Sequence, residues 1–212
     1  MAPTTEPTMD LERSLLTTAT SGAVVAIDEV GRGALAGPVT IGAVAVDRDC
    51  DHPPTGIRDS KALSERRRRD LDAPIRSWAA DVVVVHVPAS RIDEVGITRA
   101  LGEGAAQAAT EIATRLSVGT ILLDGRHDFV TPVEDRWPVR TVIKGDATCV
   151  SIAAASIVAK QERDALMRDL HESFPEYEWR RNVGYGTAAH RSAIALHGPS
   201  AFHRRSWNLL PS

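Results

Sequence analysis

The sequence contains little cysteine and no long apolar segment. Only Cys50 and Cys149 occur in 212 residues, which excludes a disulfide framework and a thiolate metal site. No apolar run approaches the roughly 18 residues that a membrane helix needs. The first residues lack a basic stretch followed by an apolar core, so no signal peptide is expected. These absences predict a cytoplasmic protein with no membrane partner.

Lysine is also scarce. Lys61, Lys144 and Lys160 are the only lysines beside 22 arginines. An arginine guanidinium is a planar fork, whereas a lysine ammonium is a compact cation. A chain that otherwise uses arginine is therefore expected to keep lysine where a compact cation is needed.

The charges are unevenly distributed. The formal net charge is −3, but residues 179–212 contain five arginines and no acid, so this segment is +5 and the remainder −8. Six of the nine aromatic residues lie within 174–207. A basic, aromatic segment suits a polyanionic partner that also stacks on rings. A solvated face with a packed terminal helix would explain the same composition.

Five apolar runs predict strands, and their order predicts an α/β fold. The runs are residues 23–28, 39–46, 81–87, 119–124 and 139–144. Helices are expected at 9–16, 64–79, 90–95, 98–116, 151–173 and 187–197, with Pro74 bending or interrupting the second. Three consecutive strands indicate an antiparallel part, and the later alternation indicates parallel crossovers. We therefore expect one domain with a mixed central sheet and helices on both faces.

Acidic residues follow three of these strands. Asp28 and Glu29 end the first, Asp124 ends the fourth, and Asp146 follows the fifth. Ligands of open α/β sheets bind beyond the carboxyl ends of strands. Several carboxylates without cysteine favour Mg²⁺ or Mn²⁺, and two such ions about 4 Å apart would clamp both reacting oxygens of a phosphodiester. One such acid alone fits a helix cap or an ion pair equally well, so the prediction depends on the set.

The neighbours Asp28 and Glu29 pose a geometric question. Adjacent residues of a regular strand point to opposite faces. Either the strand breaks at Asp28, or Glu29 acts through its backbone carbonyl or from a different angle.

Two glycine-rich segments lie beside the predicted strands and helices. Gly31 and Gly33 flank Arg32, which lets the backbone approach a ligand closely while the guanidinium reaches a phosphate. Glycines also flank Tyr185, whose ring is a possible stacking platform. Each motif alone is equally typical of a plain turn.

Together these segments resemble ribonuclease HII, the type 2 ribonuclease H family. The resembling stretches are AIDEVGRGALAGPV (26–39), DSKALSERRR (59–68), LLDG (122–125), IKGDATCVSIAAASIVAKQERD (143–164) and GYGTAAHRSAIALHGPSAFHRRSW (184–207). They span nearly the whole chain in the family's order. The related ribonuclease HIII carries an additional N-terminal substrate-binding domain, for which about 22 residues before the first strand leave no room.

The resemblance implies a ribonuclease H-like mixed sheet flanked by helices, with a small C-terminal helical extension. We expect a loose N-terminal arm (1–22), a catalytic domain (23–173) and a basic, substrate-binding helical extension (174–212). The implied activity is that of a metal-dependent endoribonuclease acting on RNA–DNA hybrids and 5′ to ribonucleotides embedded in duplex DNA. It would leave 3′-hydroxyl and 5′-phosphate ends and remove misincorporated ribonucleotides. A monomer is expected.

The resemblance also implies roles for individual residues. The four acids Asp28, Glu29, Asp124 and Asp146 match the catalytic metal-site positions, to be occupied by two Mg²⁺ or Mn²⁺ ions. The backbone of Gly31, Arg32 and Gly33 would sense the ribose 2′-hydroxyl, and Tyr185 would stack on the following deoxyribose. The expected phosphate contacts are Lys61, Lys144, Ser156, Lys160 and Arg191. Asp128, an additional acid after Asp124, has no implied role.

Two other functions remain open from the sequence. A non-catalytic hybrid-binding protein could keep the fold, although the intact set of four acids argues against it. A DNA nuclease or resolvase of the same fold is disfavoured by the two glycine-rich segments together. RNA recognition must depend on the 2′-hydroxyl, because that group distinguishes RNA from DNA locally.

Overall fold

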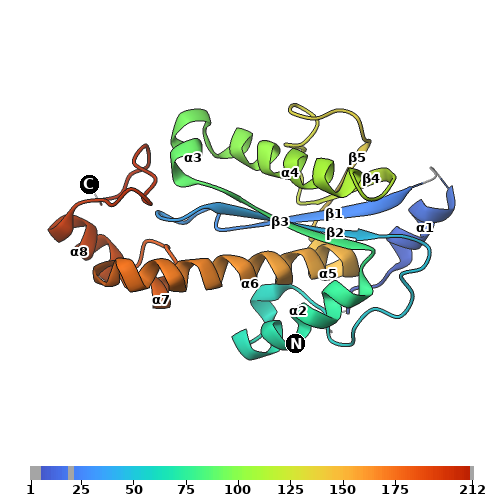
Figure 1. Cartoon of the computed structure of the whole chain (residues 1–212), viewed down its shortest axis with the longest axis horizontal. Coiled ribbons are helices and arrows are strands. Elements are labelled where there is room, and N and C mark those ends of the chain that lie inside the picture. Colours follow the sequence, from blue (N-terminus) through green and yellow to red (C-terminus); the bar gives the residue numbers. More distant parts are fainter. Residues whose placement is uncertain (1–5, 19–21, 211–212) are drawn as a thin grey trace.

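A mixed five-stranded sheet forms the centre of the computed structural model, which describes residues 6–18 and 22–210 (Figure 1). The strands are β1 (Ala23–Val30), β2 (Val39–Val46), β3 (Asp81–Val87), β4 (Val118–Asp124) and β5 (Val139–Val142). Their spatial order is β3-β2-β1-β4-β5. The first three strands pair antiparallel, whereas β4 runs parallel to β1 and β5 parallel to β4. The predicted mixed sheet is confirmed.

Helices cover both faces of the sheet. On one face lie α3 (Ala89–Val95) and α4 (Ile97–Ala113), and on the other α1 (Asp10–Thr18), α2 (Glu65–Trp78) and α6 (Val150–Ser173) (Figure 1). Alternate residues of β1 serve the two layers: Val25 and Ile27 face α4, and Val24 and Ala26 face α6. An apolar run without polar alternation is what a strand buried on both faces requires.

The long helix α6 lies directly on β2. A Cβ at Gly42 of β2 would be 2.3 Å from the backbone oxygen of Ala155, so only glycine permits this approach. The close contact fixes the start of α6 against the sheet.

None of the helices within residues 6–18 and 22–210 is long and apolar enough to cross a membrane.

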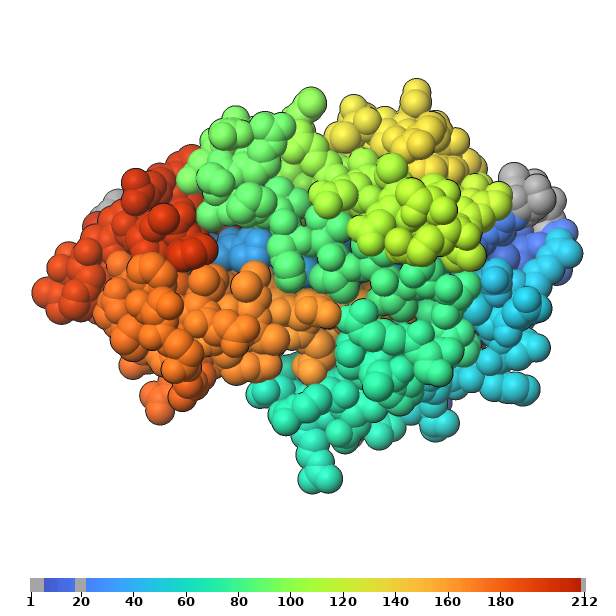
Figure 2. All heavy atoms as spheres, viewed as in Figure 1, coloured from blue at the N-terminus to red at the C-terminus, as the bar shows by residue number. Residues whose placement is uncertain are grey.

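The C-terminal part forms a small helical cluster at one end of α6 (Figure 1). Its elements are η2 (Pro175–Tyr177), α7 (Trp179–Asn182) and α8 (Ala188–His197). In Figure 2 the red C-terminal residues that follow α8, up to residue 210, lie against both α6 and α3. Tyr177 and Trp179 are buried and stack at 5.1 Å between ring centroids, so these two aromatic residues are core.

Two expectations about local structure are corrected. Residues 6–18 are not a loose arm, because Met9 and Leu16 are buried and Glu12 accepts hydrogen bonds from Ser151 N (2.9 Å) and Oγ (2.6 Å). The other residues of the predicted arm lie outside the described ranges, except for Gly22, which immediately precedes β1. Pro74 does not interrupt α2, which runs through it and begins after Ser64, whose side chain accepts a hydrogen bond from Arg67 N.

Candidate active site

Two of the predicted acids meet at one edge of the sheet because β1 and β4 are adjacent and parallel. Ala26 pairs with Leu122 and Ile27 with Leu123, so Asp28 and Asp124 follow at the same level. Ala26 and Leu122 face α6, and a strand repeats its direction every two residues, so Asp28 and Asp124 point to that same side.

The third acid enters from the short helix α5 (Gly145–Thr148), which follows β5. The N–H of Gly145 donates to Asp124 Oδ1 at 2.7 Å and ties the start of α5 to the end of β4. A Cβ at Gly145 would be 2.5 Å from the Ile152 side chain and 3.2 Å from Asp124 Oδ1, so glycine allows this contact. Asp146 is thereby brought to the same edge.

The four acids form one electrostatic cluster. Asp28 is only 8% exposed, and burial raises its pKa well above the ordinary value. The charges of Glu29, Asp124 and Asp146 raise it further, although the N–H of Glu29 donates to Asp28 Oδ1 at 2.8 Å and opposes the shift. Burial and the charge of Asp124 also raise the pKa of Asp146. Like charges held this close disfavour full ionisation.

The geometric question about Glu29 is answered by the strand itself. β1 does not break at Asp28 but continues to Val30, with Asp28 paired to Gly42 and Glu29 to Ile41. Glu29 is half-buried near the end of this strand, and its N–H donates to Asp28 Oδ1. Its Oε1 accepts from Arg32 Nη1 at 3.3 Å. Burial raises the pKa of Glu29, Arg32 lowers it, and Asp124 raises it, so the Glu29 carboxylate is coupled electrostatically to Asp124 while it pairs with Arg32.

The donor set fits a hard divalent cation, although the side chains are not yet arranged around one. The described part of the chain has no group of three His, Cys, Asp or Glu side chains that could hold a metal ion as they stand. One oxygen each of Asp28, Glu29 and Asp124 is engaged in the bonds above, and each carboxylate has a second oxygen. Repulsion between these carboxylates raises the pKa values of Asp28 and Asp146, and a bound cation would offset that repulsion. Mg²⁺ and Mn²⁺ prefer oxygen ligands.

Lys61 is the predicted lysine that faces the acids. It lies in η1 (Ser60–Ala62), capped by Asp59, whose Oδ1 accepts from Lys61 N at 2.9 Å. Burial lowers the pKa of Lys61, but the charges of Asp59, Asp28, Asp146 and Asp124 together raise it above the ordinary value. Asp59 also raises the pKa of Asp146 and was not singled out from the sequence. Its place in the stretch DSK beside Lys61 was the available signal.

The two glycine-rich segments lie side by side. Gly184 O accepts hydrogen bonds from Leu35 N (2.8 Å) and Ala36 N (3.2 Å), which joins the turn after β1 to the loop before α8. Gly31 has φ +84°, and a Cβ there would be 2.1 Å from the Arg163 guanidinium. Arg32 and Gly33 are exposed. Tyr185 is 38% exposed, with its ring 5.7 Å from the Arg163 guanidinium carbon.

Three of the predicted phosphate contacts make hydrogen bonds or ion pairs within the chain, and their contact with phosphate stays a prediction. Ser156 is buried; its Oγ accepts from Ser60 N at 3.2 Å and donates to Ala153 O at 2.9 Å, so it supports η1. Lys160 pairs with buried Asp164 at 2.6 Å. Arg191 donates to the backbone oxygens of Asn208 and Leu209, at 3.2 and 2.8 Å, and holds the C-terminal segment.

The phosphate contact of Lys144 stays a prediction, and Asp128 has a structural role. Lys144 is exposed and has a left-handed backbone, immediately before α5. Asp128 accepts from the N–H groups of Val130 (2.8 Å) and Thr131 (2.9 Å), so it caps the turn after β4.

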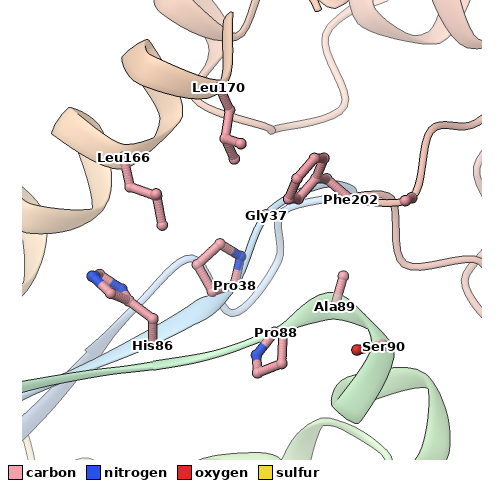
Figure 3. A pocket seen from close by; sticks show the side chains of 10 residues that line it. Gly37, Pro38, His86, Pro88, Ala89, Ser90, Leu166, Leu170 and Phe202 are labelled. Atoms are coloured by element: carbon pink, nitrogen blue, oxygen red, sulfur yellow. The ribbon is translucent and has the colours of Figure 1, made fainter. Parts of the chain in front are cut away.

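An apolar hollow of about 250 Å³ lies outside the acid cluster (Figure 3). Leu166 and Leu170 of α6 line one side, and Pro38, His86 and Phe202 complete much of the wall. None of the four acids lines it. The hollow therefore lies apart from the candidate reaction centre.

The sequence did not reveal two buried arginines behind the glycine-rich turn. Arg204 and Arg163 are fully buried, and their guanidinium groups donate to backbone carbonyls of residues 31–38 and of Val183. Arg204 belongs to the basic segment that was considered for duplex contact. Because Arg204 is buried, its side chain packs inside the protein and does not face a duplex.

The chain is similar to known proteins along most of its length. Residues 25–210 match the family model described as Ribonuclease HII. The Ribonuclease HII of Streptomyces griseus is 41% identical, covering 96% of this chain and 85% of that protein. The Ribonuclease HII of Salinibacter ruber is 45% identical, covering 88% and 91%.

Solved structures share the fold. A chain of the PCNA:RNase HII complex from Archaeoglobus fulgidus superposes with a TM-score of 0.74 at 26% identity, covering 90% of this chain and 97% of that one. Bst-RNase HIII in complex with Mn²⁺ gives a TM-score of 0.70 at 19% identity, covering 93% and 71%. The second likeness concerns the fold alone. The expected ribonuclease H-like α/β architecture is confirmed.

Proposed function

Because this chain belongs to the ribonuclease HII family and is a ribonuclease H-type hydrolase, we propose that it cuts RNA at two kinds of site. One is the RNA strand of RNA–DNA hybrids. The other is the bond 5′ to a ribonucleotide embedded in duplex DNA, with 3′-hydroxyl and 5′-phosphate ends as products. The proposed role is removal of misincorporated ribonucleotides. The observation that carries the proposal is an acid cluster at the end of β1 whose next residues form the exposed Arg32–Gly33 turn.

For the reaction centre, Asp28, Glu29, Asp124 and Asp146 would hold two Mg²⁺ or Mn²⁺ ions. Such ions supply activation of water and stabilise the charge on the leaving oxygen. The protein's own contribution is position: β1 and β4 hold Asp28 and Asp124 at one level, and α5 delivers Asp146 beside them. The buried position of Asp28 makes it the central ligand in this proposal.

For substrate recognition, the backbone of Gly31–Gly33 would meet the ribose 2′-hydroxyl, and Tyr185 would stack on the sugar that follows. The hydrogen bonds from Leu35 and Ala36 to Gly184 support a single reading surface formed by both segments. Lys61 and Lys144 are the candidate phosphate contacts. Lys61 would also balance the acids before substrate binds, since their charges raise its pKa.

The test is cleavage of three matched duplexes by the purified chain with Mg²⁺ or Mn²⁺. One duplex carries a single ribonucleotide, one is a long RNA–DNA hybrid, and one is all DNA. We expect cleavage of the first two only, abolished by EDTA, with 3′ ends that a DNA polymerase extends. Binding without cleavage under both metals would favour a hybrid-binding protein, and cutting of the all-DNA duplex would favour a DNA nuclease.

A further inference from the structure

Arg204 holds the turn after β1 from the inside. Its Nη1 donates to Arg32 O at 2.7 Å and its Nη2 to Gly31 O at 2.6 Å, and both Nη2 and Nε lie 3.3 Å from Gly37 O. Within the described ranges, Arg204 has no carboxylate in ion-pair contact, so backbone carbonyls take up its donors. A buried guanidinium satisfied only by carbonyls fixes the direction in which those carbonyls point.

The direction of a carbonyl fixes the direction of the next N–H. In a trans peptide, the C=O of one residue and the N–H of the following residue point opposite ways, and no cis peptide occurs in the described chain. Gly31 O and Arg32 O point inward to Arg204. The N–H groups of Arg32 and Gly33 must therefore point away from it.

These two N–H groups are free donors on an exposed turn. Arg32 and Gly33 are both exposed. In the part of the chain that the structure describes, neither N–H donates to another residue, whereas the next N–H, of Ala34, returns to Gly31 O at 3.2 Å. Two successive unpaired donors suit one small oxygen acceptor, such as a hydroxyl.

Arg204 is itself held by contacts other than those of its guanidinium with Gly31 and Arg32. Its N–H donates to Leu35 O at 2.9 Å. The next two residues are anchored on α3, because Asp93 accepts from Arg205 N (2.9 Å), Ser206 N (3.0 Å) and Ser206 Oγ (2.6 Å). The guanidinium also lies 4.8 Å from the Trp207 ring centroid.

We propose that Arg204 is a positioning residue for RNA recognition, which orients the peptide planes 31–32 and 32–33 so that two N–H groups meet the ribose 2′-oxygen. The inference rests on the proposed function, because it assumes that this turn reads the sugar. Arg204 touches no substrate in this account; it acts through Gly31 and Arg32.

The test compares affinity for a duplex with one ribonucleotide and for its all-DNA counterpart, in an Asp28→Asn background that leaves the substrate uncut. Arg204→Lys keeps the charge but loses the planar fork that holds two carbonyls at once. We expect this variant to lower the ratio of the two affinities about tenfold, as the loss of one or two hydrogen bonds predicts. Binding to the all-DNA duplex should change less than twofold, by comparison.

Two controls separate orientation from general damage. Arg205→Lys alters the neighbouring exposed arginine and should leave the ratio unchanged. Arg163→Lys removes the other buried fork, which donates to Ala36, Pro38 and Val183 but to neither Gly31 O nor Arg32 O. It should lower the melting temperature while keeping most of the ratio. An equal fall in the ratio for Arg163→Lys would overturn the specific role of Arg204.

If Arg204→Lys does not fold, Asp93→Asn provides the second variant, since it loosens only the anchor of residues 205–206. It should lower the ratio by a smaller factor than tenfold, and an unchanged ratio would overturn the inference. The Asp28→Asn protein without a second substitution is the parent, and its binding separates the two proposals. A parent that binds both duplexes equally would refute sugar reading by this turn and the proposed function with it. A parent that discriminates, beside a folded Arg204→Lys that discriminates equally well, would refute the inference alone.

Discussion

Charged side chains are buried both in the acid cluster and behind the glycine-rich turn, but the groups that surround them differ in the two regions. At the end of β1, Asp28 is surrounded by charges of its own sign, which together with burial raise its pKa. Behind the turn, Arg204 and Arg163 donate to backbone carbonyls, so their polar groups are satisfied. Burial of charge is costly unless partners replace water. The first region therefore stores repulsion that a ligand can relieve, and the second provides a rigid support.

The largest effect is expected from removing the central charge of the acid cluster. Asp28→Asn is nearly isosteric but loses the charge that would hold cations, so cleavage should be abolished while duplex binding persists through phosphate contacts elsewhere. Without metal the same variant should melt at a higher temperature, because the raised pKa of Asp28 shows that its ionised form is disfavoured. Each kcal/mol of repulsion removed should raise the melting temperature by about 2–4 °C.

The matched control is Asp128→Asn, an acid that caps a turn outside the cluster. It should keep cleavage and lower the melting temperature. Multiple-turnover cleavage by Asp28→Asn near the wild-type rate would contradict the assignment of Asp28. A lower melting temperature for that variant in EDTA would contradict the stored repulsion.

The next effect concerns Tyr185, at the border between the two regions. Tyr185→Ala should reduce cleavage of single-ribonucleotide duplexes by about one to two decades, as loss of stacking predicts. Long hybrids should lose less, because each contains many alternative sites. Tyr185→Phe keeps the ring and should retain most activity. Equal losses on both substrates would make the Tyr185 ring a packing element.

The acid edge was predictable from the sequence because its signals are local. Each strand is an apolar run, and Asp28 and Asp124 stand where such runs end. A parallel pairing of β1 with β4 then suffices to bring them together. Asp146 needed the additional information that α5 folds back to Asp124 through Gly145.

The support behind the turn was not predictable in the same way. Arg204 and Arg205 are adjacent and chemically identical, yet one is fully buried and the other exposed. The difference comes from carbonyls about 170 residues earlier in the chain, which no local pattern announces. Ser156 shows the same limit, since its contact with Ser60, 96 residues earlier in the chain, supports η1 and is not announced by any local pattern.

The C-terminal region contains a second satisfied group, a buried histidine pair behind Tyr185. His190 Nδ1 lies 2.9 Å from Tyr185 O, so it must carry a proton and donate. His190 Nε2 accepts from Trp179 Nε1 at 3.1 Å, which leaves His203 Nε2 to donate across the 3.1 Å between the rings. His203 Nδ1 accepts from Ser200 N at 3.0 Å. Both rings are thus neutral with fixed tautomers, and a proton added at His203 Nδ1 would displace the hydrogen bond from Ser200 N and leave Ser200 Oγ, at 2.9 Å, as its acceptor.

The smallest effect at neutral pH is expected from this pair, and it becomes visible in acid. Burial lowers the pKa of His203 to about 4 from an ordinary value of 6.5, and repulsion from His190, once it is protonated, and from Arg205 adds to the shift. Its folded-state pKa lies below the unfolded one, so no stability is lost above pH 6.5. Stability is then lost progressively as pH falls from 6.5 towards 4, by about 2 kcal/mol at pH 5. Unfolding free energies measured from pH 7.5 to 4.5 should therefore fall more steeply for the wild type than for His203→Gln, which keeps a donor but cannot titrate in this range.

The raised pKa values of Asp28 and Asp146 act in the opposite direction, but they are common to both proteins and cancel in the difference. His197→Gln, at an exposed position in α8, should reproduce the wild-type slope. Identical slopes for His203→Gln and the wild type would mean that His203 is already charged in the folded protein, and the tautomers assigned to this pair would be wrong.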